Sequence, residues 1–548
     1  MRSLNNCLKL LSMITATMVL AGCAKVGPDF TKPPAAVSSE WLSSDDERVK
    51  RESANYRAWW EIFNDPVLNN LIGKAYRENY SLKIAAVRVL EARAQLGIAV
   101  GELYPQSQQA SGALTFIRTS GSSSSSAGSQ PAGTTGSGPS GQSGQSSTGA
   151  GGFQRSFWQD QINVNAAWEI DFWGKFRRNV ESLDASLRAT IFDYDSALVS
   201  LTADAANSYV QIRTLQKRLE IARENADTQR ESLRIAEARF KGGTTSQRDV
   251  EQARTLLFNT LATIPNLQMQ LSQLLHALSV LLGTPPEDLT KLLEGSQDIP
   301  CAPPSVAAGI PADLLRRRPD VRSAELRAAA QCAQIGFAKA DLYPAFSLTG
   351  SFGFAATSAG RSSLSDIADW KSRTGSGGPS FQWNILNYGQ ITNNVRVQDA
   401  RFQELLLTYQ NTVLTAQQQV EDSLTGFLRS QENADYLAQS AQAAKHSLEL
   451  AALQYREGST DFTTVLTAQQ ALLTAQDSLA TAIGNISGNL VGLYRAIGGG
   501  WEIAQGEDIL PPDVKEAMAR RTNWGRLLSP AAYMRDDSSR SDIRSPDW

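Results

Sequence analysis

The chain has 548 residues, of which 20% are charged, and it carries a net charge of −3 at pH 7 with an isoelectric point near 5.7. So small a net charge predicts no basic surface for nucleic acid. The length alone would allow about three or four domains, but the internal repetition described below favours one interlocked architecture.

The first segment, Met1–Gly22, is typical of a signal peptide, because basic residues precede a short apolar core at Leu10–Leu20. That core is too short to span a membrane as a retained helix. Leu20-Ala21-Gly22-Cys23 resembles a bacterial lipobox, which implies cleavage before Cys23 and lipid on its sulfur and new amino group. We therefore expect residues 23–55 to form a lipid-anchored segment. The alternative is an ordinary signal peptide with an incidental cysteine.

A first repeat is predicted over residues 56–300. Asp65-Pro66 is typical of a helix start, with Asp as the N-cap and Pro in the first turn, and helices then run to about Leu103. Tyr104-Pro105 ends them, and a strand follows. Its apolar face would hold Ala110, Gly112, Leu114 and Phe116. The stretch Thr119–Gly152, almost wholly Ser, Gly, Thr, Gln and Ala, is predicted to be a low-complexity loop inside this repeat.

A strand and a very long helix follow the loop. Gln161–Phe172 alternates apolar and polar residues, which indicates a strand with one apolar face. Lys175–Lys241 has no Gly or Pro and shows helical periodicity throughout, so it predicts a helix of roughly 100 Å. Gly242-Gly243 predicts a tight reversal. A second helix is expected from about Ser246 to Leu282, with a kink at Pro265.

The same plan occurs a second time. Phe381–Ile385 alternates, and Gln390–Glu457 is again long and free of proline. Gly389 registers on Gly174 at an offset of 215 (389 minus 174), and this offset also places Tyr455 on Phe240, Gly458 on Gly243 and Val465 on Val250. We therefore predict a second repeat over residues 311–500. Its other elements would be a helix over Ala312–Ala340, a strand with Phe346, Leu348, Gly350, Phe352 and Phe354 on one face, and a return helix to about Ile497.

Three further features accompany the repeats. Cys301 and Cys332 would lie in a compartment where disulfides can form, so they either pair or remain two buried thiols. Arg316-Arg317-Arg318 is predicted to be an exposed basic cluster at a helix start. The charged, Pro- and Ser-rich tail 501–548 has no partner in the repeat.

The predicted strands imply an oligomer if they lie in a membrane. Each repeat supplies two strands, and four strands cannot close a barrel, because the smallest membrane barrels have about eight. An open sheet edge would leave backbone groups unpaired in lipid. The alternative is a soluble β-sandwich with a helical stalk, but helices of this length exceed what such a domain needs.

The two-copy plan of strands and long helices resembles the TolC-type outer membrane factor family, and within it the NodT-type efflux lipoproteins. The stretches that carry the resemblance are Cys23–Phe30, Trp59–Pro66 and Ile310–Val321, and it covers nearly everything from Cys23 to about Trp501. It implies a mainly α fold with membrane β-strands. Three copies would form a 12-stranded outer membrane β-barrel continuous with a 12-helix periplasmic α-barrel.

The resemblance also implies a role for the helix reversals, which form the periplasmic tip of such channels, where the tunnel is gated and an adaptor protein docks. The matching residues are Arg239, Phe240 and Gly243 in the first repeat (copy one), and Gln454, Tyr455, Gly458, Val465, Leu466 and Ala468 in the second repeat (copy two). The simpler alternative is that the glycines only cap helices and the aromatic residues only pack, and both interpretations can hold together.

The chain departs from the family's pattern at the gate. Members often carry tunnel-facing aspartates just past the second reversal, where this chain has Thr464 and Thr467. An acidic constriction would have to come from Asp461, or from Asp249 and Glu251 in copy one.

No motif in the sequence predicts catalysis, a metal site or a cofactor. The only two histidines, His276 and His446, lie within predicted helices without Cys or His at metal-ligand spacing. Neither a phosphate-binding loop nor a nucleophile elbow occurs. Energy for transport would therefore have to come from another protein.

These observations predict a passive duct. The chain would be the outer membrane component of a tripartite efflux system and would receive drugs or other small molecules from an inner-membrane pump through a periplasmic adaptor. The alternatives are a duct for protein secretion and a non-transporting coiled-coil lipoprotein of the envelope.

Overall fold

The computed structural model describes residues 25–50, 52, 56–118, 156–287, 289, 291–295, 298–312, 317–358 and 363–529. The predicted signal peptide, the predicted lipidation residue Cys23, the predicted loop 119–152 and the end of the tail therefore lie outside the described residues. The chain divides into two compact units, each assembled from three segments. The first contains Met1–Gly27, Ile98–Asn179 and Gly336–Val395, and the second contains Pro28–Gly97, Val180–Ile335 and Arg396–Trp548.

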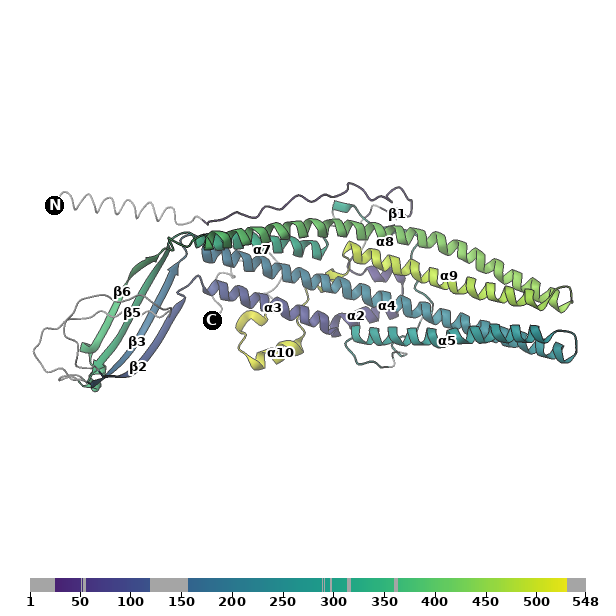
Figure 1. Ribbon diagram of the computed structural model, residues 1–548, viewed down its shortest axis with the longest axis horizontal. Helices are drawn as coiled ribbons and strands as arrows, with labels where there is room; N and C mark the ends of the chain where they lie inside the picture. Colours follow the sequence, from purple (N-terminus) through teal and green to yellow (C-terminus); the bar gives the residue numbers. More distant parts are fainter. Residues whose placement is uncertain are drawn as a thin grey trace, which may run out of the picture. The chain divides into compact units, whose positions relative to one another are not determined.

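The first unit is built on one four-stranded sheet in the order β2-β3-β5-β6 (Figure 1). The strands are β2 Ser107–Arg118, β3 Ser156–Ile170, β5 Ala345–Thr357 and β6 Arg373–Gln382. Each neighbouring pair is antiparallel. The prediction of two strands from each repeat is therefore confirmed.

The two faces of this sheet differ in chemistry. One row across the strands consists of Ala110, Val164, Phe352 and Gly375, and the next row consists of Gln109, Asn165, Ser351 and Ser376. Because side chains alternate between the faces of a sheet, one face is apolar and the other polar. On the polar face, the Ser351 and Ser376 hydroxyl oxygens lie 2.8 Å apart and form a hydrogen bond.

The last strand differs from its prediction. Alternation predicted a strand over Phe381–Ile385, whereas β6 begins at Arg373 and ends at Gln382. Much of β6 is glycine (Gly375, Gly377 and Gly378), and glycine has no side chain that could show an alternating pattern. Hydrogen bonding to β5, rather than an apolar pattern of its own, positions this strand.

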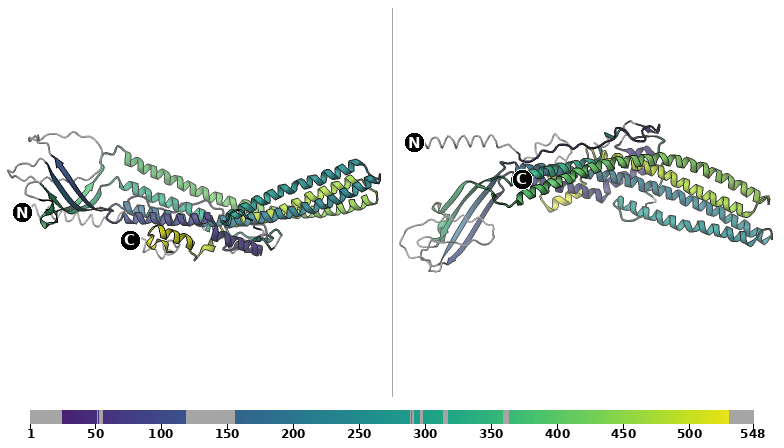
Figure 2. Two further views of the ribbon diagram at one scale, coloured as in Figure 1. Left: turned by 90° about the horizontal axis from the view of Figure 1, so that it is seen from below. Right: turned by 45° about the horizontal axis from the view of Figure 1, so that its top comes forward.

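The second unit is mostly helical (Figures 1 and 2). It holds α2 Pro66–Glu78, α5 Gln247–Leu281, α9 Phe462–Ile497 and α10 Pro512–Arg521, and most residues of α3 Tyr80–Gly101, α4 Lys175–Lys241, α7 Pro319–Ala340 and α8 Gln390–Arg456. The long helices are confirmed, since α4 and α8 have 67 residues each. Within the described residues, the chain forms no helix with the length and apolar character needed to cross a bilayer.

Local sequence signals explain where several helices begin. The Asp65 carboxylate accepts hydrogen bonds from the N–H groups of Val67 and Leu68, and Pro66 is the first residue of α2, as predicted. The helix expected over Ala312–Ala340 is interrupted: residues 311–312 and 317 are helical, Arg318 is not, and α7 begins at Pro319, because proline suits a first turn and disrupts a helix interior. Helix α5 contains Pro265 without ending there.

Shorter elements complete the described chain. Strand β1 Val49–Lys50 pairs in parallel with β4 Val306–Ala307, a contact that the sequence did not predict. Single 3-10 turns lie at Trp59–Phe63, Leu364–Ala368, Trp370–Ser372, Trp501–Ala504 and Gly525–Leu528.

Backbone geometry follows the internal repeat. Six glycines with positive φ form three pairs that share the repeat offset, namely Gly174 and Gly389, Gly243 and Gly458, and Gly283 and Gly498. The offset therefore holds without an insertion from the start of each long helix to the end of the helix that follows it. Any residue of α4 or α5 thus has a counterpart in α8 or α9 at the same offset.

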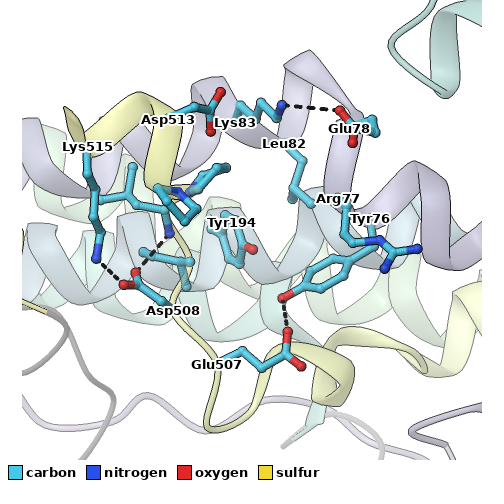
Figure 3. Close-up of a pocket in the computed structure, with 14 residues that line it drawn as sticks. Tyr76, Arg77, Glu78, Leu82, Lys83, Tyr194, Glu507, Asp508, Asp513 and Lys515 are labelled. Carbon is cyan, nitrogen blue, oxygen red and sulfur yellow. Dashed lines mark hydrogen bonds and ion pairs between the residues drawn. The ribbon is translucent and has the colours of Figure 1, made fainter. Parts of the chain in front are cut away.

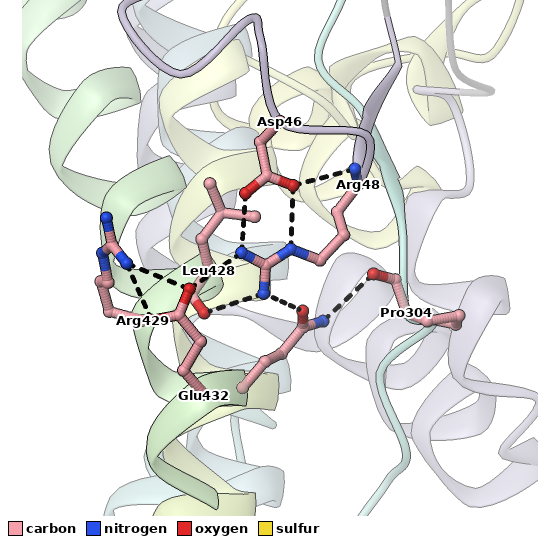
Figure 4. Close-up of polar contacts among 7 residues, drawn as sticks. Asp46, Arg48, Pro304, Leu428, Arg429 and Glu432 are labelled. Atoms are coloured by element: carbon pink, nitrogen blue, oxygen red, sulfur yellow. Dashed lines mark hydrogen bonds and ion pairs between the residues drawn. The ribbon is translucent and has the colours of Figure 1, made fainter. Parts of the chain in front are cut away.

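The N-terminal segment of the second unit is fixed to α8. The N–H of Ser38 donates to Gln417 at 3.0 Å. Arg48 pairs with Asp46 at 2.7 Å and with Glu432 of α8 at 3.1 Å (Figure 4). Hydrogen bonding to the Arg48 guanidinium lowers the pKa of Asp46 to about 2. Arg48 and Glu432 are both charged at neutral pH, and their ion pair favours attachment of this segment to α8.

The basic cluster predicted to be exposed is not exposed in the described part, and that prediction was wrong. Arg318 is buried and donates to the carbonyl oxygen of Ala496 at 2.6 Å. Arg317 pairs with Glu502 at 2.6 Å. Arg316 lies outside the described residues. Both partners lie much later in the chain, so nothing in the neighbouring sequence indicates them.

Cys301 and Cys332 are not joined. Cys301 is exposed, whereas Cys332 is buried and its thiol lies 3.7 Å from the carbonyl oxygen of Pro28. The disulfide alternative is therefore not borne out, and the alternative of two buried thiols holds only for Cys332.

Candidate functional site

The first helix reversal ends α4 through backbone geometry that glycine permits. Gly243 has a φ of 72°, in the left-handed region that residues with a Cβ rarely adopt. Its N–H donates to the carbonyl oxygen of Phe240 at 2.9 Å. The N–H of Thr244 donates to that of Arg239 at 2.9 Å, and the Thr244 hydroxyl adds a bond to the same oxygen at 3.1 Å. These bonds satisfy carbonyl groups that the end of a helix leaves unpaired.

The second reversal repeats this geometry at the equivalent position of copy two. Gly458 has a φ of 75°, and its N–H donates to the carbonyl oxygen of Tyr455 at 3.2 Å. Both the N–H and the hydroxyl of Ser459 donate to the carbonyl oxygen of Gln454, at 2.9 and 3.0 Å. No atom lies within 4 Å of a Cβ built on Gly243 or Gly458, so backbone conformation rather than crowding explains glycine at both turns.

A small apolar core joins the four helices at the reversals. Tyr455, Phe462 and Val465 are buried in it, and the Tyr455 and Phe462 rings lie 5.0 Å apart. The complete cluster is Ala236, Val250, Ala253, Ala451, Tyr455, Phe462, Val465, Leu466 and Ala468. This cluster brings together four of the tip residues predicted in the second repeat, namely Tyr455, Val465, Leu466 and Ala468. Phe240, predicted in the first repeat, is exposed instead.

Arg239 links the two reversals. Its guanidinium lies 4.2 Å from the centroid of the Tyr455 ring. It also donates to the carbonyl oxygens of Tyr455 at 3.2 Å and Arg456 at 3.5 Å, at the C-terminal end of α8. A cation is favourable there because the helix dipole makes that end negative. The Tyr455 hydroxyl is buried and has no hydrogen-bond partner in the described part of the chain.

The candidate gate acids have different local roles. Asp249 accepts from the Thr245 hydroxyl at 2.6 Å and forms a capping box with Ser246 at the start of α5. The hydrogen bond from Thr245 lowers the pKa of Asp249. Glu251 pairs with Arg254 at 3.1 Å. Asp249 is thus a helix cap, and its predicted part in an acidic constriction stays a prediction.

The second repeat has the same threonine hydrogen bond at the start of its return helix, but a threonine accepts it in place of the charged aspartate. Thr464 is the counterpart of Asp249, and the Thr460 hydroxyl donates to it at 3.1 Å, as Thr245 does to Asp249. Asp461 is the N-cap residue of α9, is exposed, and makes no side-chain capping bond. Thr467 is also exposed.

Polar contacts hold α4 against α9 beyond the reversals, and sequence reasoning did not find them. Arg218 pairs with Asp477 at 2.7 Å. The amide of Asn225 donates to Gln476 at 2.8 Å, and Gln469 donates to the Ser232 hydroxyl at 2.7 Å. Polar residues on a helix face are usually solvated, so their burial could be inferred only with the partner helix known.

A groove of about 630 Å³ lies between α2, α3 and the C-terminal segment (Figure 3). Several of its polar side chains contact one another: Tyr76 donates to Glu507 at 3.1 Å, Lys83 pairs with Glu78 at 3.7 Å, and Lys515 pairs with Asp508. This pattern is typical of a docked chain segment. In the described part of the chain, no three His, Cys, Asp or Glu side chains are grouped so as to hold a metal ion.

Comparison with known proteins gives consistent matches over most of the chain. A family model described as outer membrane efflux protein matches residues 71–284 and 310–499. Nodulation protein T of Rhizobium leguminosarum bv. viciae is 30% identical over 486 residues, which are 88% of this chain and 92% of that protein. The pyoverdine export outer membrane protein OpmQ of Pseudomonas aeruginosa is 30% identical over 504 residues, 90% and 98% of the two chains. The solved outer-membrane channel OprN has a TM-score of 0.76 and 30% identity, covering 87% of this chain and all of that one (100%).

Proposed function

The chain belongs to the outer membrane efflux protein family and is an efflux channel of the outer membrane that extends into the periplasm, and from this premise we propose how it forms its duct. Three copies join their four-stranded sheets into a 12-stranded barrel, and their helices form a 12-helix tunnel. The family consists of channel proteins, and a channel supplies no energy of its own. Transport through this protein is therefore passive.

The open edges of the sheet support this assembly more than any other observation. Strands β2 and β6 each pair on one side only in the described structure. An edge in lipid would leave a row of N–H and C=O groups without partners, at a cost of several kcal/mol each. Joining β6 of one copy to β2 of the next removes every edge.

The chemistry of the faces supports the orientation of the barrel. The exposed apolar side chains of the sheet are Leu114, Phe116, Trp158, Ile162, Val164, Ile170, Leu348, Phe352 and Phe381. They suit contact with lipid, and the Ser, Asn and Gln residues of the other face suit a water-filled interior. Lipid on Cys23 adds an anchor beside the barrel.

The cargo is drugs or other small molecules. They are delivered by an inner-membrane pump through a periplasmic adaptor that docks at the helix reversals. Export of pyoverdine by OpmQ supports small-molecule cargo. The contact of Arg239 with Tyr455 supports a tip that opens when the adaptor separates the two reversals.

Conductance of the purified protein in planar bilayers tests the duct. Discrete current steps are expected, and cells that lack the gene should accumulate more of a fluorescent efflux substrate than complemented cells. A protein that inserts in the bilayer but carries no current would contradict the proposal.

A further inference from the structure

Two exposed arginines lie on the two edge strands of the sheet, at the same end of the strands. Arg118 is the last residue of β2, and Arg373 is the first residue of β6. The opposite end of β2 follows α3, and the opposite end of β6 leads into α8, so both arginines lie at the end remote from the helices. In the proposed barrel, whose helices extend into the periplasm, this end lies at the outer leaflet of the membrane.

Both arginines belong to the apolar face of the sheet. Arg373 lies in one row with Phe354 and Ile162. Arg118 follows Phe116 by two residues in β2 and therefore shares its face, because side chains alternate along a strand. In the proposed barrel this is the face that contacts lipid.

Aromatic side chains surround the two positions. Near the end of β2, the rings of Phe116 and Trp158 lie 5.1 Å apart. At the start of β6, the Arg373 guanidinium lies 5.1 Å from the centroid of the Trp370 ring, which is 6.3 Å from the Phe354 ring. Trp370 is 66% exposed. Aromatic residues of membrane barrels collect at the level of the lipid headgroups, so these arginines lie at the depth of the lipid phosphates.

No acidic side chain neutralises either charge. Within the described residues, Arg118 and Arg373 form no ion pair, and Arg373 donates to the carbonyl oxygen of Trp370 at 2.8 Å. Asp160 is on the same face, but it lies opposite Leu114, four residues before Arg118 and therefore about 13 Å from it along the strand. Each edge of the sheet thus presents an uncompensated cation at the outer end.

Closure of the barrel changes the surroundings of these cations. Within one copy of the chain, three strand spacings, or about 14 Å, separate β2 from β6. Where β6 of one copy joins β2 of the next, that separation falls to one spacing of about 4.8 Å. Like charges on adjacent strands are destabilising when they stand on the same face. An anion bound between the arginines would remove this repulsion.

We propose that Arg373 of one copy and Arg118 of the next copy form a site at each seam of the barrel for a phosphate of lipid A, the phosphorylated glycolipid of the outer leaflet. The inference rests on the proposed three-copy barrel and adds a ligand to it. A guanidinium group matches phosphate oxygens with two parallel hydrogen bonds. The apolar stem of each arginine lies along the lipid face while its charged end reaches the headgroup.

Binding of lipid A to the detergent-extracted, delipidated particle tests the site. Native mass spectrometry counts bound lipids, and we expect lipid A to bind at least about tenfold more tightly than zwitterionic phosphatidylethanolamine. Arg118→Gln and Arg373→Gln should each lower the affinity for lipid A about tenfold, because each removes charge-assisted hydrogen bonds. The matched control is Lys371→Gln, which removes an exposed cation that precedes β6 and should change the affinity less than about twofold.

The mass of the particle is measured for every variant, so that failure of the site and failure of the assembly are distinguished. Arg118→Gln carries the decision, because Arg373→Gln also removes the contact with Trp370. A three-copy particle in which Arg118→Gln leaves the affinity for lipid A unchanged overturns the site alone. An equal loss of affinity in Lys371→Gln also overturns it, since the binding would then follow the total charge of the rim. A one-copy particle overturns the assembly itself.

Discussion

The two helix reversals have the same backbone and different side chains. Gly243 and Gly458 have φ values of 72° and 75°, and the same bonds close both turns. Yet Arg239 corresponds to Gln454, and the exposed Phe240 corresponds to the buried Tyr455. The duplication has thus preserved the backbone of the turn. The first repeat supplies the cation, Arg239, and the second repeat supplies the aromatic ring, Tyr455, that this cation covers.

The largest expected effect breaks the aromatic half of this comparison. Tyr455→Ala removes a buried ring from the apolar core and should lower the local opening free energy of the reversals by about 3 kcal/mol. Its counterpart variant, Phe240→Ala, removes an exposed ring and should cost less than about 1 kcal/mol. Hydrogen exchange of amides at the two turns measures both. Equal losses of opening free energy in the two variants would show that the burial of Tyr455 does not distinguish the two repeats.

The next effect concerns the cation. Arg239→Gln gives the first repeat the residue that the second repeat has at this position. It removes the cation–π contact and two hydrogen bonds, which should lower the local opening free energy of the reversals by about 1–2 kcal/mol. The loss should appear as faster exchange at the end of α8, although the substituted residue lies on α4. Gln454→Ala is the matched control, and exchange unchanged in both variants would contradict the link between reversals.

Because the two reversals share one backbone geometry, we expect the same glycine substitution to have the same effect in both repeats. Gly243→Ala and Gly458→Ala should each cost about 1 kcal/mol, because a Cβ is strained at positive φ. Gly242→Ala is the control, since Gly242 does not have positive φ and a Cβ there meets only carbonyl oxygens at 3.5 and 3.6 Å. A strong difference between the two turns would show that they are not equivalent.

The smallest effect is the pH dependence of one cap. The pKa of Asp249 is lowered in the folded chain, so its contribution to stability is complete above its ordinary pKa and is lost as pH falls through the folded value. Asp249→Thr, which copies Thr464, should cost about 0.5–1 kcal/mol at neutral pH and should remove that acid dependence. Hydrogen exchange at the start of α5, measured from neutral pH into the acid range, tests this, and an acid dependence that survives the substitution would contradict it.

Local signals in the sequence predicted much of the fold. The long helices needed only an apolar period and the absence of Pro, with Gly426 of α8 as the one glycine in them, and the reversals needed only Gly243 and Gly458. Strand β6 was placed too late because its glycines hide the alternation. Helix α10 in the tail was not predicted, since it is short and strongly charged.

Contacts between distant segments could not be predicted in the same way. The burial of Arg318 depends on Ala496, 178 residues later, and Arg239 meets Tyr455 across 216 residues. The repeat offset could have aligned the two turns, but it could not show that the side chains of one would cover those of the other.

The mass of the detergent-extracted particle, measured by light scattering and corrected for bound detergent, tests the central claim most directly. Three copies are predicted, because only shared strands remove the open edges of β2 and β6. A single-copy particle that stays soluble without detergent once Cys23 is replaced by Ala would contradict the barrel.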